Sequence, residues 1–289
     1  MERTDKNIVK KALPKRPDDA HKGTMGTLLS ICGSYGMIGA GILSSMGALR
    51  CGLGLLKCAV PKSVYPIAAA AVPEAVFLPL EETFSGKTDC DCLPFLLAQK
   101  ADAALLGCGL SVCDDTRSLV DGFVREWDKP MVLDADALNC LASDLSVLKS
   151  AKAPVIITPH PAEIARLIGG TAKEVNENRA QTAQDFAKRY GVVVVLKGAG
   201  TVIASPDGKT LLNTTGNSGM ATGGSGDVLA GMCASLLAQG KAPFDCAAAA
   251  VYLHGTAGDL AAKRLGKTSM LPRDIIDEIP NALKACGIE

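Results

Sequence analysis

Short runs of continuously apolar residues recur along the chain and alternate with stretches of helical period. Because the runs are apolar at every position, and not only at every second one, they predict strands that are covered on both faces. Strands and helices that alternate in this way favour an α/β fold, with a mostly parallel sheet flanked by helices on both faces. The seven runs are TLLSICG from residue 27, LLKCAVP from 55, AVFLPL from 75, DAALLGCG from 102, PMVLDAD from 130, PVIITPHP from 154 and VVVVLKG from 192.

The stretches between these runs predict helices over 37–52, 114–127, 161–169 and 173–191. Near residue 200 the pattern changes, because GTVIASPDGKTLLNTTG has two strand-like runs around the turn signal SPDG and predicts a β-hairpin. Three more helices are expected after the hairpin, over 227–240, 243–266 and 271–286. No linker or internal repeat divides the pattern. Residues 23–289 are therefore predicted to form one domain, and residues 1–22 a short helical or loose arm.

Composition narrows the class of protein. Hydrophobic residues make up 48% of the 289 and charged residues 21%, which is typical of a compact folded chain. Thirty Lys and Arg balance thirty Asp and Glu, so no broad cationic field predicts binding to nucleic acid or to an anionic membrane surface. The charged N-terminal segment lacks the apolar centre of a secretory signal, and no later stretch is apolar enough to span a bilayer, so a cytoplasmic protein is expected. The eleven Cys are scattered without CxxC pairs, which favours buried, reduced thiols over disulfides or a metal site.

Candidate chemistry appears first in ATGGSGDVLAGM, residues 221–232. Gly224, Ser225 and Gly226 bring bare backbone to the start of an apolar helix, where free N–H groups and the helix dipole favour a phosphate; these three residues predict an anion hole. A carboxylate repels phosphate but can serve as a general base, and Asp227 is the candidate. The plainer alternative is a tight turn with an ordinary acid at a helix start. The bare segment TTGNSGMATGG is longer than a turn requires, which favours the site.

The longer segment NTTGNSGMATGGSGDVLAGM resembles the signature of the ADP- or ATP-dependent NAD(P)H-hydrate dehydratases, members of the ribokinase-like superfamily. The family pattern is close to TGNPGMATGGTGDVLAG, so Ser218 replaces a usual proline and Ser225 a usual threonine. In GCGL, Cys108 stands where a proline is common. The resemblance covers residues 22 to about 285, through KGTMGTLLSICGSYGMIGAGILSSMGALRCGLGLLKCAVP from 22, LLGCGL from 105, VLDADALN from 132, ITPHPAEIARL from 157 and VLKGAGTVI from 195.

The resemblance implies a repair reaction that removes the water added to the nicotinamide ring of NADH or NADPH, acting on the S-form of the hydrates NADHX and NADPHX. The ring hydroxyl is phosphorylated by ADP or ATP with Mg2+, and phosphate is then eliminated. Asp227 would be the catalytic base and would also contact the substrate. The resemblance further implies a homo-oligomer, often a tetramer. Many relatives carry an epimerase domain in front of this one, and 22 leading residues are too few to encode it, so a separate epimerase chain is expected.

Further candidate residues lie where predicted strands end. KGAGT follows the run VVVVL, so Lys197 is placed to neutralise nucleotide phosphate while the glycines let the nucleotide approach the backbone. A hairpin turn with a solvated lysine is the alternative. By resemblance this segment binds the AMP portion of the nucleotide. The predicted nucleotide-binding residues are Lys197, Gly198, Ala199, Gly200, Thr201 and Gly226.

TPHPAE places His160 directly before Pro161, a proline favoured in the first turn of a helix, with Glu163 three residues after the histidine. By resemblance His160 contacts the hydrated nucleotide and Glu163 helps to hold metal-bound water. The glycine-rich segment after the first strand predicts close helix packing and a bare wall against a flat ring. The resemblance adds Ala40 and Gly109 as substrate contacts.

Some residues leave alternatives open. Asp134 and Asp136 of DAD either bind magnesium or cap the following helix, while Tyr252 and His254 fall in an alanine-rich helix and are predicted to pack. Two other functions also fit the chain. One is a ribokinase-like kinase for a small alcohol of the vitamin-precursor type, which releases a stable phosphoester. The other is a nucleotide-binding regulator without turnover, which would leave Asp227 as an unexplained acid in an anion site.

Overall fold

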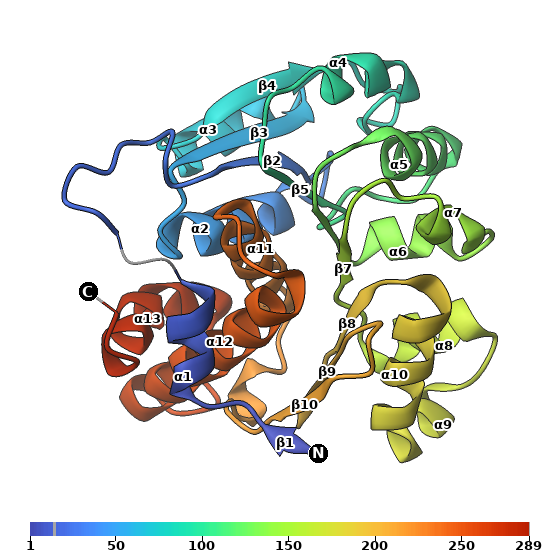
Figure 1. Ribbon diagram of the computed structural model, residues 1–289. Coiled ribbons are helices and arrows are strands. Elements are labelled where there is room, and N and C mark those ends of the chain that lie inside the picture. Colours follow the sequence, from blue (N-terminus) through green and yellow to red (C-terminus); the bar gives the residue numbers. More distant parts are fainter. Residues whose placement is uncertain (14–15, 289) are drawn as a thin grey trace.

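One sheet of ten strands forms the centre of the molecule (Figure 1). The computed structural model describes residues 1–13 and 16–288. The strands are β1 (Glu2–Arg3), β2 (Thr27–Ile31), β3 (Leu55–Pro61), β4 (Val76–Leu80), β5 (Ala103–Leu106), β6 (Met131–Leu133), β7 (Val155–Ile157), β8 (Val193–Leu196), β9 (Thr201–Ala204) and β10 (Thr210–Asn213). Their order across the sheet is β1-β10-β9-β8-β7-β6-β5-β2-β3-β4. Among these strands β9 alone runs against its neighbours, so the predicted, mostly parallel sheet is confirmed.

Helices cover both faces of the sheet, as predicted (Figure 1). The first face carries α1 (Lys6–Ala12), α2 (Ile38–Arg50), α3 (Tyr65–Ala71), α11 (Ser225–Ala238), α12 (Pro243–Leu265) and α13 (Pro272–Ala285). The second carries α4 (Leu93–Leu97), α5 (Asp114–Glu126), α6 (Asp136–Leu141), α7 (Ser146–Lys149), α8 (Pro161–Ile168), α9 (Ala172–Glu177) and α10 (Arg179–Tyr190). Two single turns of 3-10 helix, η1 (Cys90–Cys92) and η2 (Ser218–Met220), lie in the connections.

Neighbouring strand residues enter different cores, which explains why the strands are apolar at every position. Leu28 of β2 packs into the core under α11 and α12, whereas Leu29 packs into the core under α5 and α10. Leu105 and Leu106 of β5 divide in the same way, and all four side chains are fully buried. A strand between two helical layers has no face for polar side chains.

The predicted helices differ from the structure in three respects. The helix expected over 173–191 is two helices, α9 and α10, which break at Asn178 because its φ of −131° is not helical. The helix expected from residue 227 begins two residues earlier, at Ser225. The short helices α3, α4, α6 and α7 did not show as separate periodic stretches, since four to seven residues give too few turns for a period to be seen.

The first residues of the chain pack against the rest of the fold. Strand β1 pairs with β10 at one end of the sheet, and Val9 and Ala12 of α1 are fully buried in the core beside α12. The helical form of the predicted N-terminal arm is therefore the one observed over residues 6–12.

Helices α2 and α11 approach each other so closely that only glycine fits at the contact. A Cβ on Gly231 would lie 1.9 Å from the carbonyl oxygen of Ser44, and one on Gly47 would lie 2.8 Å from that of Val228. The contact fixes the position of α11, and with it the position of the helix N-terminus. The close packing predicted for the glycine-rich segment after the first predicted strand is seen at Gly41, where a Cβ would lie 2.9 Å from the Cys32 carbonyl oxygen.

Two predictions from composition can be compared with the structure. All eleven cysteines are free, and all but Cys90 and Cys113 are buried, as expected for reduced thiols. Within residues 1–13 and 16–288, every helix is too short or too polar to cross a membrane.

Candidate active site

The carboxyl ends of four neighbouring parallel strands meet beside the N-terminus of α11. Strands β5, β6, β7 and β8 are adjacent in the sheet, and α11 contacts β5 and β6. The segments that follow these strands carry Gly109, Asp134, His160 and Lys197 respectively. Ligands of α/β sheets usually bind at this edge. The sheet thus gathers candidate residues that are far apart in the sequence.

The N-terminus of α11 presents free backbone donors. Gly224 is its N-cap, and its φ of +99° is a backbone conformation that requires glycine. Across the part of the chain that the structure describes, the N–H groups of Gly224, Gly226 and Asp227 have no protein acceptor. The N–H of Ser225 donates a long bond of 3.4 Å to the Thr222 carbonyl. The free donors thus include Asp227, which was not in the predicted anion hole, and Ser225 is partly engaged.

Asp227 lies in the first turn of α11 with its carboxylate only partly exposed. Burial, and secondarily the negative charge of Asp134, raise the pKa of Asp227 to about 6, although the Cys108 thiol and Lys197 oppose that rise. A carboxylate with this pKa is ionised at neutral pH and holds a proton more firmly than an ordinary aspartate. Both properties suit a general base.

Lys197 forms a buried ion pair directly beside this helix start. Its Nζ lies 2.7 Å from Oδ1 of Asp134 and 3.8 Å from Oε2 of Glu163. Burial works against the ammonium charge, but the two carboxylates outweigh it and raise the pKa of Lys197 above its ordinary value. A Cβ on Gly226 would lie 3.3 Å from the same Nζ, so the ammonium group sits next to the α11 backbone. The alternative of a hairpin turn with a solvated lysine is right about the turn, since β8 and β9 pair antiparallel, and wrong about the lysine, which is ion-paired with 17% of its side chain exposed.

The interpretation of Asp134 and Asp136 as helix caps is wrong, because α6 has no side-chain cap, while the magnesium interpretation stays a prediction. Asp134 is buried and accepts hydrogen bonds from Lys197 and from Thr158 Oγ1, the latter at 2.7 Å, and does not cap α6. Asp136 lies within the first turn of α6 and accepts the N–H of Ser111 at 2.8 Å. These carboxylates hold neighbouring strand ends together. An acid–lysine pair 63 residues apart gives no local sequence signal.

His160 and Glu163 form a reciprocal cap at the start of α8. The His160 N–H donates to Oε2 of Glu163 at 2.7 Å, and Nδ1 of His160 accepts from the Ala162 N–H at 3.1 Å. Desolvation raises the pKa of Glu163, although Lys197 opposes the rise. Glu163 is buried, whereas the His160 side chain is 50% exposed and lies open to a ligand. The prediction that His160 opens a helix at this edge is confirmed.

The turn between β8 and β9 is the second segment with free donors. Gly198 and Gly200 have φ values of +149° and +71°. In the described chain the N–H groups of Gly198, Ala199 and Gly200 have no protein acceptor, while Thr201 Oγ1 donates to the Gly198 carbonyl at 3.1 Å. The sequence did not identify Arg179, which contacts this turn from α10.

The predicted substrate wall is brought together by the ends of β2 and β5. Gly109 has a φ of +64°, and a Cβ on it would lie 2.9 Å from the Cβ of Ala40. Cys108, the residue before it, places its thiol 3.8 Å from Oδ2 of Asp134. The Cys108 sulfur and carboxylate oxygens of Asp134 and Asp227 all lie within 4.8 Å of one another. Ala40, Gly109 and the candidate base therefore belong to one region, and Cys108, noted from the sequence only as a departure from proline, faces the base.

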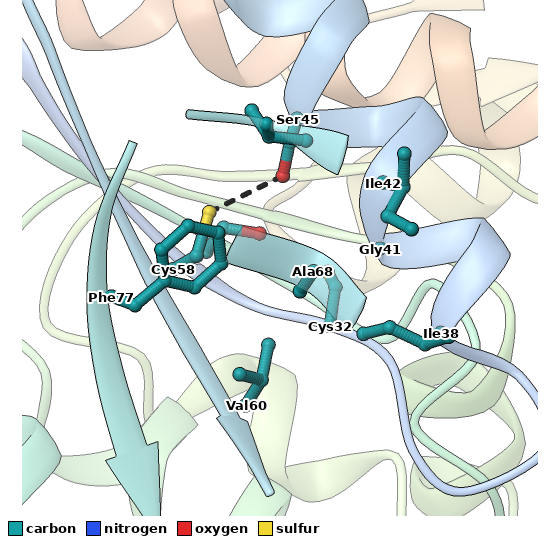
Figure 2. Close-up of a pocket in the computed structure, with 11 residues that line it drawn as sticks. Cys32, Ile38, Gly41, Ile42, Ser45, Cys58, Val60, Ala68 and Phe77 are labelled. Carbon is teal, nitrogen blue, oxygen red and sulfur yellow. Dashed lines mark hydrogen bonds between the residues drawn. The ribbon is translucent and has the colours of Figure 1, made fainter. Parts of the chain in front are cut away.

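A small cavity lies behind this wall, between α2, α3 and the strands β2 and β3 (Figure 2). Its lining is mostly apolar, and Ser45 and Cys58 contact each other at 3.3 Å across it. The volume of about 10 Å³ corresponds to roughly one water molecule. The cavity is too small for a nucleotide and is a packing feature of the core.

Comparisons with known proteins agree with this geometry. A family model described as NAD(P)H-hydrate dehydratase matches residues 28–281. The bifunctional NAD(P)H-hydrate repair enzyme of Moorella thermoacetica is 44% identical over 274 residues, which are 94% of this chain and 52% of that protein. The chain thus spans about half the length of such bifunctional relatives.

Two solved structures share the whole fold. The ADP/ATP-dependent NAD(P)H-hydrate dehydratase of Bacillus subtilis, co-crystallised with ATP and Mg2+, is 34% identical with a TM-score of 0.87, over 99% of this chain and 98% of that one. A ribokinase-like superfamily protein of Enterococcus faecalis is 30% identical with a TM-score of 0.86, over 99% of this chain and 96% of that one. The expected ribokinase-like fold is confirmed.

Proposed function

Because the chain belongs to the NAD(P)H-hydrate dehydratase family, we propose that it converts the S-form of NADHX or NADPHX back to NADH or NADPH at the expense of ADP or ATP. The single observation that carries the proposal is the juxtaposition at α11, where unpaired N–H groups adjoin a carboxylate whose pKa is about 6. A site that only bound anions would gain nothing from that carboxylate.

In the proposed reaction Asp227 accepts the proton of the ring hydroxyl while the hydroxyl oxygen attacks the terminal phosphoryl group of the nucleotide. The N–H groups of Gly224, Gly226 and Asp227 stabilise the negative charge on the transferring group. In the second step the ring C–O bond breaks, phosphate leaves with the bonding electrons, and loss of a proton from the neighbouring ring carbon restores the double bond. Phosphorylation is useful because phosphate is a far better leaving group than hydroxide.

The remaining residues supply binding. Ala40 and Gly109 form the wall against the hydrated ring, and the exposed imidazole of His160 contacts the substrate nucleotide. Lys197, Gly198, Ala199, Gly200, Thr201 and Gly226 hold the phosphoryl donor. Lys197 does so as half of an ion pair with Asp134, so it screens the acidic residues beneath the phosphates and is not free to follow the nucleotide.

The residues here fit a hard divalent cation. Asp134, Glu163 and Asp227 place three carboxylates around one lysine, and magnesium prefers oxygen ligands. Asp134 is already engaged by Lys197 and Thr158, so Glu163, acting through water, is the residue that would help to hold Mg2+. When bound with the nucleotide, the ion would neutralise phosphate charge.

A defined assay separates the proposal from its alternatives. The purified chain is incubated with hydrated NADH, Mg2+ and either ADP or ATP, and the dihydronicotinamide absorbance is followed. Return of the absorbance with stoichiometric release of phosphate supports dehydration. A lasting phosphorylated product would point to the vitamin-precursor kinase, and nucleotide binding without any product to a regulator.

Three further properties are proposed. They are a homotetramer, a cytoplasmic location, and the boundary between a 1–22 arm and a 23–289 dehydratase domain. Size-exclusion chromatography with light scattering tests the first of them.

A further inference from the structure

Arg179, the first residue of α10, contacts the turn between β8 and β9 through its guanidinium group. Its Nη2 donates to three carbonyl oxygens, those of Leu196 at 2.8 Å, Lys197 at 3.1 Å and Gly200 at 3.3 Å. Its Nη1 donates to Oδ1 of Asn176 at 3.2 Å. One guanidinium therefore binds the last carbonyl of β8 and the first and last carbonyls of the turn, those of Lys197 and Gly200. Helix α10 lies beside β8 and β9, which allows this contact (Figure 1).

The direction of these bonds decides which groups the turn offers to a ligand. Because the carbonyls of residues 196, 197 and 200 accept hydrogen bonds from Arg179, they are already engaged by the protein. The N–H groups of Gly198, Ala199 and Gly200 remain without a protein acceptor among the described residues. Gly198 must be glycine here, since its φ is +149° and a Cβ would lie 2.8 Å from Nη1 of Arg179. Arginine and glycine are thus required together.

Arginine suits this task and lysine does not. A planar guanidinium directs several N–H groups into one fixed plane, whereas an ammonium group reaches one or two carbonyls from a flexible stem. Arg179 is also half-buried, so its positive charge lies close under the turn. An anion bound to the turn would experience that charge through a poorly solvated region.

We propose that Arg179 is the positioning residue of the nucleotide site: it holds the carbonyls of Leu196, Lys197 and Gly200 so that the N–H groups of the three consecutive residues 198–200 face the phosphoryl donor. This rests on the proposed function only in that the turn binds the nucleotide. Arg179 itself does not touch the nucleotide or the reacting atoms. Its effect is therefore confined to the affinity for ADP or ATP.

The test compares Arg179→Lys and Arg179→Met with the matched control Arg189→Met, which removes an exposed arginine from the same helix. Losing hydrogen bonds from a charged donor should raise KM for ADP about tenfold or more in Arg179→Met. Arg179→Lys should lie between it and the wild type. We expect kcat at saturating nucleotide to stay within about twofold, and KM for the hydrate to be unchanged.

Two direct readouts accompany the kinetics. Calorimetric titration with Mg2+-ADP measures the dissociation constant without turnover, and added guanidinium ion should partly restore the affinity of Arg179→Met but not alter the control. An unchanged affinity in Arg179→Met would overturn the proposal, as would equal losses in kcat, both KM values and thermal stability. If Arg179→Met does not fold, Arg179→Lys decides on the same readouts. A wild-type chain that binds ADP but does not dehydrate the hydrate would contradict the proposed function, while the affinity comparison would still test Arg179.

Discussion

Two glycine-rich segments meet the same edge of the sheet, and they are held in place by different means. The start of α11 is fixed by packing, since Gly47 and Gly231 bring α2 and α11 into backbone contact. The turn between β8 and β9 is fixed by one polar side chain, Arg179. Both segments leave three N–H groups without protein acceptors in the described chain.

The difference shows how a bare backbone is kept in one conformation. Glycine gives close approach and positive φ at the cost of conformational freedom, so another part of the fold must supply the constraint. At α11 the constraint is a buried interface, which suits a segment that carries Asp227 and must not move during the reaction. At the turn it is a set of hydrogen bonds near solvent, which suits a segment that binds and releases a nucleotide. Changes at α11 should therefore affect kcat or folding, and changes at the turn should affect KM.

The largest expected effect belongs to Asp227→Asn. The amide keeps the size of the side chain but cannot accept the hydroxyl proton, so kcat should fall by about two orders of magnitude or more. Nucleotide affinity should stay close to the wild-type value, because the N–H donors are unchanged. Single-turnover kinetics and calorimetry measure the two quantities. Wild-type kcat in this variant would remove the proposed role of Asp227.

The next effect tests the packing that holds α11. In Gly231→Ala the new Cβ would lie 1.9 Å from the Ser44 carbonyl oxygen, so α2 and α11 must separate. We expect a loss of about 3 kcal/mol in the free energy of unfolding, the upper end of the usual cost of overpacking. Urea denaturation measures it. The matched control is Gly39→Ala in α2, where a Cβ meets no atom within 4 Å. Equal stability of the two variants would show that the contact between α2 and α11 tolerates a Cβ at position 231.

The sequence alone predicted the features that depend on local patterns, and it missed the contacts between residues far apart in the chain. Strands, hairpin and most helices are local patterns, and Asp227 was identified because its glycines precede it directly. Lys197 and His160 were placed at one edge of the sheet by their positions after predicted strands, and the resemblance added Ala40 and Gly109; the sheet brings all four to that edge. The ion pair of Lys197 with Asp134 joins residues 63 positions apart. Arg179, at the start of α10, contacts a turn that begins 18 residues later in the sequence. Such partners depend on strand order and helix placement, which no local pattern contains.

A smaller effect is expected at the turn from Gly198→Ala. The substitution strains a φ of +149° and brings a methyl group against Nη1 of Arg179, so the carbonyls should lose part of their alignment. KM for ADP should rise about fivefold to thirtyfold, from a strain of roughly 1 to 2 kcal/mol, with kcat nearly unchanged. Gly208→Ala is the control, because it strains a φ of +95° in the turn between β9 and β10 and leaves the nucleotide turn unchanged. A fall in kcat without a change in KM would reverse the division of roles between the two segments.

The smallest effect concerns the pH dependence of stability that Asp227 gives to the start of α11. The pKa of Asp227 is about 6 in the folded chain against an ordinary value of 3.8, mainly because of burial. Between about pH 4 and pH 6 the folded state thus binds a proton that the unfolded state does not, so stability falls as pH rises through this window. The full cost of the ionised, poorly solvated carboxylate is present above pH 6. Asp227→Asn carries no such cost. After discounting for partial exposure, its free energy of unfolding should exceed that of the wild type by about 1 to 2 kcal/mol more at pH 8 than at pH 4. Urea titrations across this range measure the difference. Parallel curves for the two proteins would mean that Asp227 is well solvated. The proposal of a buried base with a raised pKa at the start of α11 would then be wrong.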